Sequence, residues 1–155
     1  MFHISEVDKS DAELAYLIGE LDAFQSQLYP AESNHCLDLS TVSEKELRCI
    51  IVRGENGSAV GCGAILFQGD GACELKRVYI RPEYRGRKLG EQIIAGLERL
   101  ATENACHLLR LETGIHQQPA IALYHRCGFE ICEAFLPYIA DPLSVFMRKT
   151  IRKAH

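Results

Sequence analysis

One stretch, residues 78–101, restricts the fold of this chain more than any other, because it joins a strand to a helix through a short cationic loop. Large apolar and β-branched side chains lead up to Pro82, which cannot donate to a strand ladder and therefore ends the strand. From Leu89 onward, apolar residues recur with the 3.6-residue period of a helix. The sequence therefore predicts a strand that ends near Ile80 and a helix that begins near Leu89.

The connecting loop, residues 85–90, has the composition of an anion-binding site. It combines two glycines with three cationic side chains and lies at the predicted start of the helix. A helix N-terminus presents unpaired N–H groups and a partial positive charge, and glycines let a ligand approach the main chain. Phosphate is the ligand that suits such a loop. The alternative is a plain basic turn, because short glycine motifs also occur by chance.

Length and composition favour an ordinary globular domain. The 155 residues are enough for one sizeable core, so we expect residues 1–155 to form a single domain. No apolar run approaches the roughly 18 residues of a membrane helix, and the acidic N-terminal segment is unlike a signal peptide. Seven cysteines, an odd number without a C-x-x-C pair, argue against a disulfide framework or a zinc cluster. We therefore expect a cytoplasmic protein with mostly reduced cysteines, no membrane contact and no metal.

Charge is distributed unevenly along the chain. A net charge of −4 disfavours nucleic acid as a partner. Residues 1–47 hold ten acidic and two basic side chains, whereas six cations lie within residues 76–88. This distribution fits a polyanionic cofactor at the centre and a cationic substrate approaching from the acidic half. The alternative is that the acids form ordinary solvated helix faces.

The first half of the chain predicts a strand, a helix and an antiparallel meander. Residues 2–7 alternate as a strand, and Asp8 or Ser10 is positioned to cap the helix that follows. Three further strands, separated by turn residues, are predicted at residues 47–53, 59–68 and 72–80. Gly61 and Gly63 weaken the middle strand, or mark a bulge or a close backbone approach.

The second half adds a parallel neighbour to that sheet. The helix from Leu89 leads to a strand at residues 108–113, and a strand–helix–strand crossover makes parallel neighbours. A short helix at residues 119–126 ends before Gly128, and a last strand at residues 143–149 closes the sheet. We therefore expect an α+β fold with a mixed, mostly antiparallel sheet and one parallel strand pair.

Two motifs resemble signatures of the GNAT superfamily of N-acyltransferases. Residues 85–90 are similar to the acetyl-CoA signature Arg/Gln-x-x-Gly-x-Gly/Ala, which precedes a long helix. Lys88 stands where the family usually has glycine, which argues against any need for positive φ there. Residues 117–129 resemble the second signature, Asn-x-x-Ala-x-x-Leu-Tyr-x-x-x-Gly-Phe, with Gln117 in place of asparagine. The order of elements also fits the family along nearly all of the chain, which looks most like bacterial members of unassigned substrate.

The resemblance implies a GNAT fold, with the central parallel pair splayed around acetyl-CoA and helices on both faces of the sheet. It implies that backbone amides of the 85–90 loop hold the pyrophosphate, while main-chain N–H groups of the preceding strand bind the thioester and pantetheine. The implied cofactor-binding residues are Val78, Ile80, Arg85, Gly86, Arg87, Lys88, Leu89, Gly90 and Gln117. The segment after the first helix lines the acceptor pocket in this family, which makes Glu32 and His35 candidate substrate-binding residues. A plain surface turn is the alternative for both.

The resemblance also implies two catalytic residues. Glu74 corresponds to the glutamate that some members use as a general base; the alternative is a structural partner for Lys76 or Arg77. Glu112, on the parallel strand, is the reserve candidate. Tyr124 matches the tyrosine that protonates the departing thiolate, and a phenol with a pKa near 10 suits that leaving group. As an isolated residue, it would more often serve packing.

The function implied is acetyl-CoA-dependent N-acetyltransfer to a primary amine of a small molecule or peptide, by direct attack in a ternary complex. One alternative is transfer of another acyl group, or transfer to a hydroxyl acceptor. A second is a non-catalytic acyl-CoA-binding or sensor module, which would need neither Glu74 nor Tyr124. The identity of the acceptor and the state of assembly stay open, with a homodimer among the alternatives.

Overall fold

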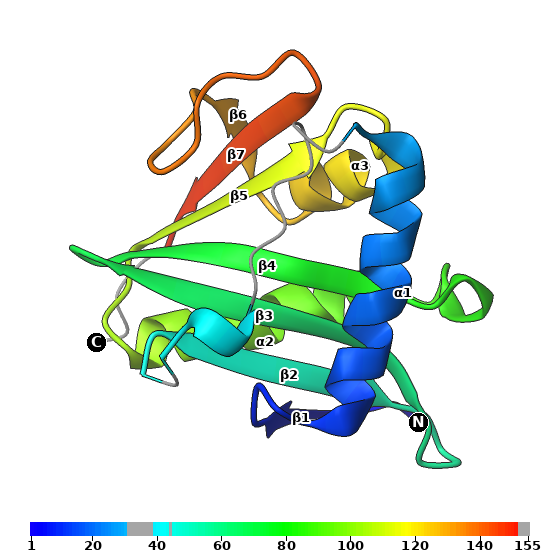
Figure 1. Cartoon of the computed structure of the whole chain (residues 1–155). Coiled ribbons are helices and arrows are strands. Elements are labelled where there is room, and N and C mark those ends of the chain that lie inside the picture. The colour runs from blue at the N-terminus through cyan, green and yellow to red at the C-terminus, as the bar shows by residue number, and fades with distance from the viewer. Residues whose placement is uncertain (31–38, 44, 152–155) are drawn as a thin grey trace.

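The computed structural model describes residues 1–30, 39–43 and 45–151. Within them, seven strands form one sheet in the order β1-β2-β3-β4-β5-β7-β6 (Figure 1). The strands are β1 (His3–Val7), β2 (Leu47–Arg53), β3 (Ala59–Gly69), β4 (Ala72–Ile80), β5 (Leu108–Gly114), β6 (Glu130–Cys132) and β7 (Ser144–Thr150). The helices are α1 (Ala12–Leu28), α2 (Leu89–Glu103) and α3 (Gln118–Arg126), with short 3₁₀ turns η2 (Leu39–Thr41) and η3 (Pro82–Tyr84).

The pairing of the strands confirms the mixed sheet that the sequence predicts. The strands from β1 to β4 pair as antiparallel neighbours, β4 and β5 run parallel, and β7 pairs antiparallel with both β5 and β6. The sequence pattern does not predict β6, because a strand of three residues is too short to show an alternation of apolar and polar side chains.

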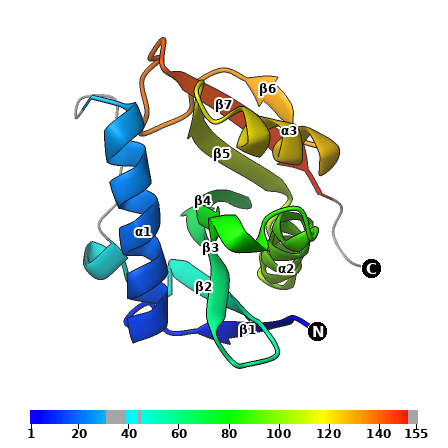
Figure 2. The ribbon, with the colours of Figure 1, turned by 90° about the vertical axis from the view of Figure 1, so that its right-hand side faces the viewer.

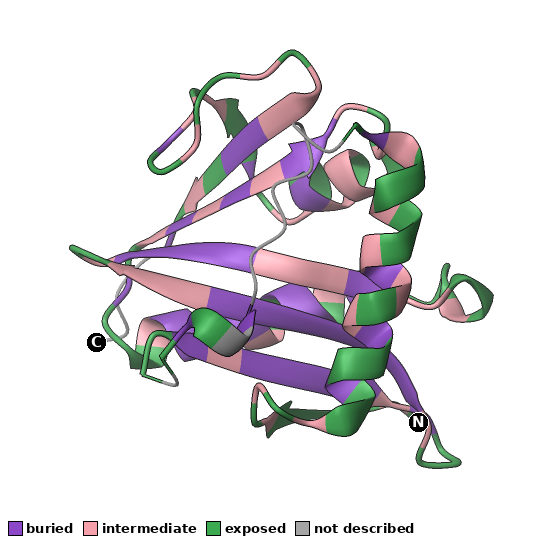
Figure 3. Ribbon diagram, in the orientation of Figure 1, coloured by how far each residue is buried: buried purple, intermediate pink, exposed green. Residues whose placement is uncertain are grey.

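Helices cover both faces of the sheet. Helix α1 and the short turn η2 lie on one face, and α2 and α3 lie on the other (Figure 2). Two separate apolar cores result. The α2-side core includes Leu75, Ile93 and Leu109, and the α1-side core includes Leu17 and Ile51. Strands β2, β3 and β4 are therefore largely buried between two layers of helix (Figure 3).

The N-terminal cap of α1 differs from the one expected. The side chain of Asp11 accepts hydrogen bonds from Glu13 N at 2.9 Å and from Leu14 N at 3.0 Å. Asp8 instead accepts from the backbone of Ser10 at 2.8 Å, which closes the turn before the helix. The prediction of Asp8 or Ser10 as the cap was wrong, because that extra turn delays the start of the helix to Ala12.

The glycines of β3 allow close packing against that strand. A side chain at Gly63 would come within 2.7 Å of Ile93 on α2, and one at Gly61 within 2.8 Å of the Tyr79 carbonyl oxygen. Opposite Gly63, β4 carries a bulge in which Arg77 has a φ of 53°. Both glycines therefore mark close backbone approaches, one of the roles the sequence left open.

Beyond the bulge, β4 separates from β5. Only three residue pairs join the two strands, from Ala72↔Leu108 to Glu74↔Arg110. The strands then diverge towards the start of α2 (Figure 1). This opening in the middle of the sheet positions the site described below.

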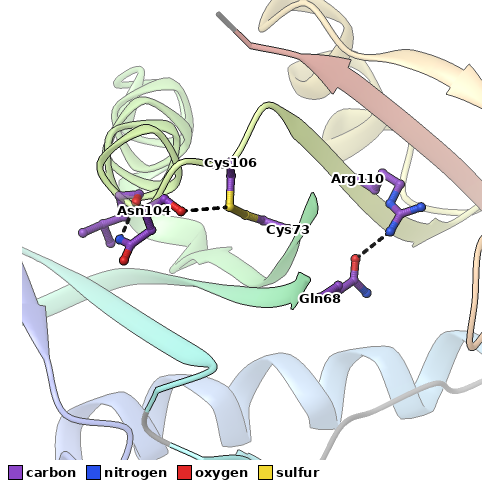
Figure 4. Close-up of a disulfide and its surroundings, with 6 residues drawn as sticks. Gln68, Cys73, Asn104, Cys106 and Arg110 are labelled. Atoms are coloured by element: carbon purple, nitrogen blue, oxygen red, sulfur yellow. Dashed lines mark hydrogen bonds between the residues drawn. A yellow bond between two sulfur atoms is a disulfide. The ribbon is translucent and has the colours of Figure 1, made fainter. Parts of the chain in front are cut away.

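One pair of cysteines departs from the expectation of reduced thiols. Cys73 of β4 forms a disulfide with Cys106, just before β5, with Cα atoms 6.6 Å apart (Figure 4). The odd cysteine count gave no hint of this pair, because only the β4–β5 crossover brings the two residues together. Among the other described cysteines, Cys49 and Cys62 are free and buried, and Cys127 and Cys132 are free and half-buried. No helix in residues 1–30, 39–43 and 45–151 is long and apolar enough to cross a bilayer.

Candidate active site

A cleft of about 470 Å³ opens where β4 and β5 diverge. Its walls are the C-terminal end of β4, the 85–90 loop, the first turn of α2 and the face of α3 that carries Pro119, Ala120 and Leu123. Leu21 and Phe24 of α1 line its far side. The cleft therefore extends from the α2 N-terminus to the face of the sheet that carries α1.

Eight of the nine predicted cofactor-binding residues line this cleft. They are Val78, Ile80, Arg85, Gly86, Lys88, Leu89, Gly90 and Gln117. Arg87 is not among the lining residues; its guanidinium lies 5.4 Å from the ring centroid of Tyr84. A cation held over an aromatic ring still contributes positive charge near the mouth of the cleft.

The backbone of the 85–90 loop leaves the start of α2 open. Lys88 is the N-cap residue, with φ 61° and ψ 23°, and its side chain makes no capping hydrogen bond. The expectation that Lys88 avoids positive φ was therefore wrong, because Lys88 itself adopts the left-handed conformation at the turn into the helix. Gly86 also has positive φ, at 82°. The first N–H groups of α2 have no side-chain cap, which suits an anionic ligand.

Gly90 has a packing role as well as a place in the cleft. It is buried, and a Cβ added to it would lie 2.7 Å from Leu123 Cδ2 on α3. The absence of a side chain therefore lets α3 approach the first turn of α2. The family motif, read as a ligand loop, does not by itself predict this contact.

The edge of β4 that faces the opening presents main-chain N–H groups, while the Ile80 carbonyl oxygen accepts from Arg85 Nε at 3.2 Å. Arg81 N donates to Val60 O at 2.9 Å, so Arg81 points its backbone towards β3. Because successive residues of a strand alternate in direction, the N–H groups of Ile80 and Val78 point away from β3. They face the side from which β5 has withdrawn.

Gln117 organises the turn between β5 and α3. Its Oε1 accepts from Gly114 N and from Thr113 Oγ1, both at 3.1 Å. Tyr29, at the end of α1, reaches the same turn, where its hydroxyl accepts from His116 N at 3.0 Å and its ring stacks on that histidine. The sequence analysis did not identify His116, which lines the cleft.

Tyr124 of α3 lies within the α2-side core and is not among the residues that line the cleft. It is 7% exposed, and its ring packs edge-on against Phe129 with centroids 5.8 Å apart. Burial raises the pKa of the Tyr124 phenol above its ordinary value, with smaller contributions from Cys127 and Glu112. The hydroxyl therefore keeps its proton at neutral pH.

Glu74 lies on the α1 side of the sheet, since its neighbours Cys73 and Leu75 point into the α2-side core. It is 1% exposed and is not among the residues that line the cleft. Its carboxylate accepts from Gln68 Nε2 at 3.1 Å and from the Tyr138 hydroxyl, and lies 2.9 Å from Lys76 Nζ. No sequence pattern pointed to Tyr138, which comes from the aperiodic loop 133–143 between β6 and β7.

Sequence comparison identifies the family. Residues 14–129 match the profile described as the Acetyltransferase (GNAT) family. The chain belongs to this family. This assignment to the family confirms the GNAT fold and the N-acetyltransferase activity that the two motifs predicted. Members of the family transfer acyl groups from acyl-CoA to amines.

Individual relatives agree with this assignment. The "IAA acetyltransferase" of Azospirillum brasilense is 43% identical over 136 residues, which are 87% of this chain and 88% of that protein. A crystal structure from Klebsiella pneumoniae, provisionally described as an acyl-CoA N-acyltransferase, is 47% identical, with a TM-score of 0.90 over 98% of this chain and 99% of that one. PaiA N-acetyltransferase from Thermoplasma acidophilum, solved in complex with coenzyme A, shares the fold, with a TM-score of 0.70 at 16% identity over 96% and 99% of the two chains.

Several acids of this GNAT acetyltransferase are used in ion pairs. Asp22 of α1 lies 3.0 Å from Arg77 Nε, and Glu20 lies 3.2 Å from Arg81 Nε. The acidic first half and the cationic β4 thus neutralise one another in part, and Arg77 is not the partner of Glu74. Glu112 accepts from Ser144 Oγ at 2.9 Å on β7. Glu32 and His35, the candidate substrate-binding residues, lie outside the described residues.

Proposed function

We propose that this acetyltransferase transfers the acetyl group of acetyl-CoA to a primary amine of a small molecule or peptide, by direct attack in a ternary complex. The observation that carries the proposal is the cleft at the divergence of β4 and β5. It connects the uncapped N-terminus of α2 with the α1 face of the sheet. A thioester and an amine can then meet from opposite faces, which aligns them for attack.

The cofactor end of the cleft is built from main chain. Backbone N–H groups of the 85–90 loop and the first turn of α2 bind the pyrophosphate, with Arg85 and Lys88 adding positive charge. The N–H groups of Val78 and Ile80 bind the pantetheine arm and the thioester oxygen, replacing the partners that β5 does not offer. When bound, acetyl-CoA supplies the activated carbonyl carbon.

Glu74 serves as the general base. An amine at neutral pH is mostly an ammonium ion and needs to lose a proton before attack. Glu74 lies on the face of the sheet from which the amine approaches, and hydrogen bonds from Gln68 and Tyr138 hold its carboxylate in one orientation. Because Glu74 is buried, the proton reaches it through an ordered water or after the substrate displaces a neighbouring donor. Glu112 remains the alternative base.

Tyr124 serves as the general acid. After the tetrahedral intermediate collapses, the coenzyme A thiolate requires a proton. The Tyr124 phenol still holds its proton at neutral pH, because burial raises its pKa. It can therefore donate to the departing sulfur and recover the proton from solvent after product release.

A thermal-shift titration tests the cofactor part of this proposal. Acetyl-CoA at a hundred times its Kd should stabilise the fold by about 2.7 kcal/mol, which is about 5–11 °C in Tm for a chain of this size. Pantetheine, which lacks the phosphates, is the matched control and should shift Tm far less. No shift with acetyl-CoA or any other acyl-CoA would overturn the proposal. Coenzyme A release with a panel of amines then tests the transfer itself.

A further inference from the structure

The basic residues of the sheet are paired with acids, with one exception. The described strands carry seven lysines and arginines, and six of them lie within 4.0 Å of a carboxylate. These six pairs are Arg48–Glu6, Arg53–Glu13, Lys76–Glu74, Arg77–Asp22, Arg148–Glu130 and Lys149–Glu98. The seventh, Arg110 of β5, has no carboxylate partner in the part of the chain that the structure describes.

The surroundings of Arg110 hold its guanidinium in place without neutralising it. Nη2 donates to Gln68 Oε1 at 3.0 Å (Figure 4), and the guanidinium carbon lies 4.6 Å from the ring centroid of Phe135. Its Nε is buried and has no hydrogen-bond partner, the one side-chain nitrogen or oxygen so placed among the described residues. A buried donor without an acceptor is costly, so an acceptor from outside these residues is expected.

Arg110 lines a hollow of about 540 Å³ between β5, β7, β6 and the loop 133–143. Its neighbours Leu109 and Leu111 point into the α2-side core, so Arg110 faces the α1 side, as Glu74 does. The other arginine of the hollow, Arg148, is paired with Glu130, and the exposed Glu133 adds a negative charge at the hollow. Arg110 is therefore the unneutralised cation of this hollow.

Arg110 and Glu74 are direct neighbours across the parallel pair, and Gln68 bonds to both. Residues in register on adjacent strands are separated by roughly 5 Å. An acceptor whose amine is near Glu74 can therefore place a second group, a few bonds away, against Arg110. A guanidinium stacked on a ring and fixed by an amide is preorganised to bind a carboxylate through its fork of N–H groups.

We propose that Arg110 binds the carboxylate of the acceptor, and that the acceptor is a small amino-carboxylate such as an amino acid. This inference rests on the proposed amine acetylation and on the position of the amine near Glu74. It assigns a substrate class to the hollow, because the carboxylate of the acceptor would neutralise Arg110, the strand cation that has no carboxylate partner among the described residues.

The test compares amino acids with their amides, which keep the amine and lose the carboxylate charge. Coenzyme A release should be faster with at least one amino acid than with its amide, by on the order of 10- to 100-fold in kcat/KM, the usual value of a charge-assisted hydrogen bond. Arg110→Gln should raise KM for that acid by a similar factor and leave the amide unchanged. Arg110→Lys, which keeps the charge without the fork, should fall between. Arg48→Gln removes a paired strand arginine elsewhere and should resemble wild type.

Each other outcome is informative. Amides or simple amines used as well as the acids would overturn the carboxylate assignment while leaving amine acetylation intact, and so would an acid preference that survives Arg110→Gln. Turnover with none of these amines would count against both proposals. An unchanged Tm shift with acetyl-CoA verifies that each variant is folded, and the preference of wild type for acid over amide requires no variant at all.

Discussion

The hydroxyl of Tyr138 donates a hydrogen bond to Oε2 of Glu74, across 64 positions in sequence. The nitrogen of Lys76 reaches both groups, donating to the Tyr138 hydroxyl and pairing with the Glu74 carboxylate. The proposed base is therefore positioned by a loop from the opposite half of the sheet.

Glu74→Gln should lower turnover by on the order of 10²–10⁴-fold, the usual contribution of a general base. The amide keeps the size of the side chain and removes its ability to take a proton, so the Tm shift with acetyl-CoA should barely change. The measurement is turnover against pH for both proteins with one accepted amine. Recovery at high pH, where the amine deprotonates by itself, would support the role.

Tyr138→Phe is the matched variant for that experiment. It removes one hydrogen bond to the carboxylate and leaves the base, so turnover should fall by on the order of tenfold, with the same pH dependence as wild type. A Glu74→Gln variant that equals wild type at every pH would move the role to Glu112 or to water alone. Loss of cofactor binding in Glu74→Gln would make Glu74 structural.

Tyr124→Phe should slow turnover by on the order of 10²-fold without changing the affinity for acetyl-CoA. The wild-type rate should show no alkaline loss from this group until above about pH 10, because burial raises the pKa of the phenol. Steady-state rates against pH test both statements. A Tyr124→Phe enzyme with the wild-type rate would leave Tyr124 as a packing residue against Phe129.

Two substitutions at Lys88 separate charge from backbone conformation. With φ at 61°, a glycine here relieves a left-handed conformation that costs a side chain roughly 1 kcal/mol, partly offset by the greater freedom of glycine in the unfolded chain. Lys88→Gly should therefore unfold in urea at the wild-type midpoint or above it, and Lys88→Ala at no higher a midpoint. Both variants should weaken coenzyme A binding alike, because both lose the cation. Tighter binding by Lys88→Ala than by Lys88→Gly would contradict this account.

Reducing agents should destabilise the protein, because they break the Cys73–Cys106 disulfide. The bond spans 33 positions, and closing a loop of that size contributes about 2–4 kcal/mol to the free energy of unfolding. Urea unfolding with and without a thiol reductant measures the difference. Cys106→Ser should have the same free energy of unfolding as the reduced wild type, and reductant should not change it. Equal stability of the wild type in both conditions would show that the two thiols stay reduced.

The buried Cys62 thiol predicts a loss of stability in alkali. Burial raises its pKa from 9.0 to about 12, and the thiol donates to Arg77 O at 3.3 Å. The folded state holds this proton more tightly than the unfolded chain, so its contribution is complete below about pH 9 and declines as pH rises towards 12, by roughly 1.4 kcal/mol per pH unit. Cys62→Ala should start less stable but lose less on going from about pH 8 to about pH 10. Equal slopes for the two proteins would refute the assignment.

The sequence predicted those elements whose side chains follow a periodic pattern and those sites that carry a recognisable motif. The apolar period after Leu89 located α2, and alternation with turn residues located the β2–β4 meander. The 85–90 loop, the strand before it and the second motif together led to eight of the residues that line the cleft. Such features depend on neighbours within a few positions, where pattern and backbone geometry are directly linked.

Long-range side-chain contacts escaped prediction, for physical reasons. Tyr138 meets Glu74, and Gln68 meets Arg110, only because the crossover and the 133–143 loop bring distant strands together. Nothing in the local pattern at Arg110 sets it apart from the paired arginines of the sheet. The cap at Asp11 was missed by a single turn, since Asp8, Ser10 and Asp11 all have side chains that can cap.

The seam between β4 and β5 has three residue pairs, whereas β2–β3, β3–β4 and β5–β7 each pair over seven. The Cys73–Cys106 bond, the Gln68–Arg110 bond and the Glu74–Tyr138 bond all cross the seam at its closed end. The sheet thus consists of two parts, β1–β4 and β5–β7, that are joined at one end of the β4–β5 seam and separated at the other. A ligand in the cleft contacts both parts where they are separated and restricts their relative motion. Amide hydrogen exchange at the C-terminal ends of β4 and β5 should therefore slow when the cleft is filled, while exchange near the disulfide and the two hydrogen bonds should stay the same.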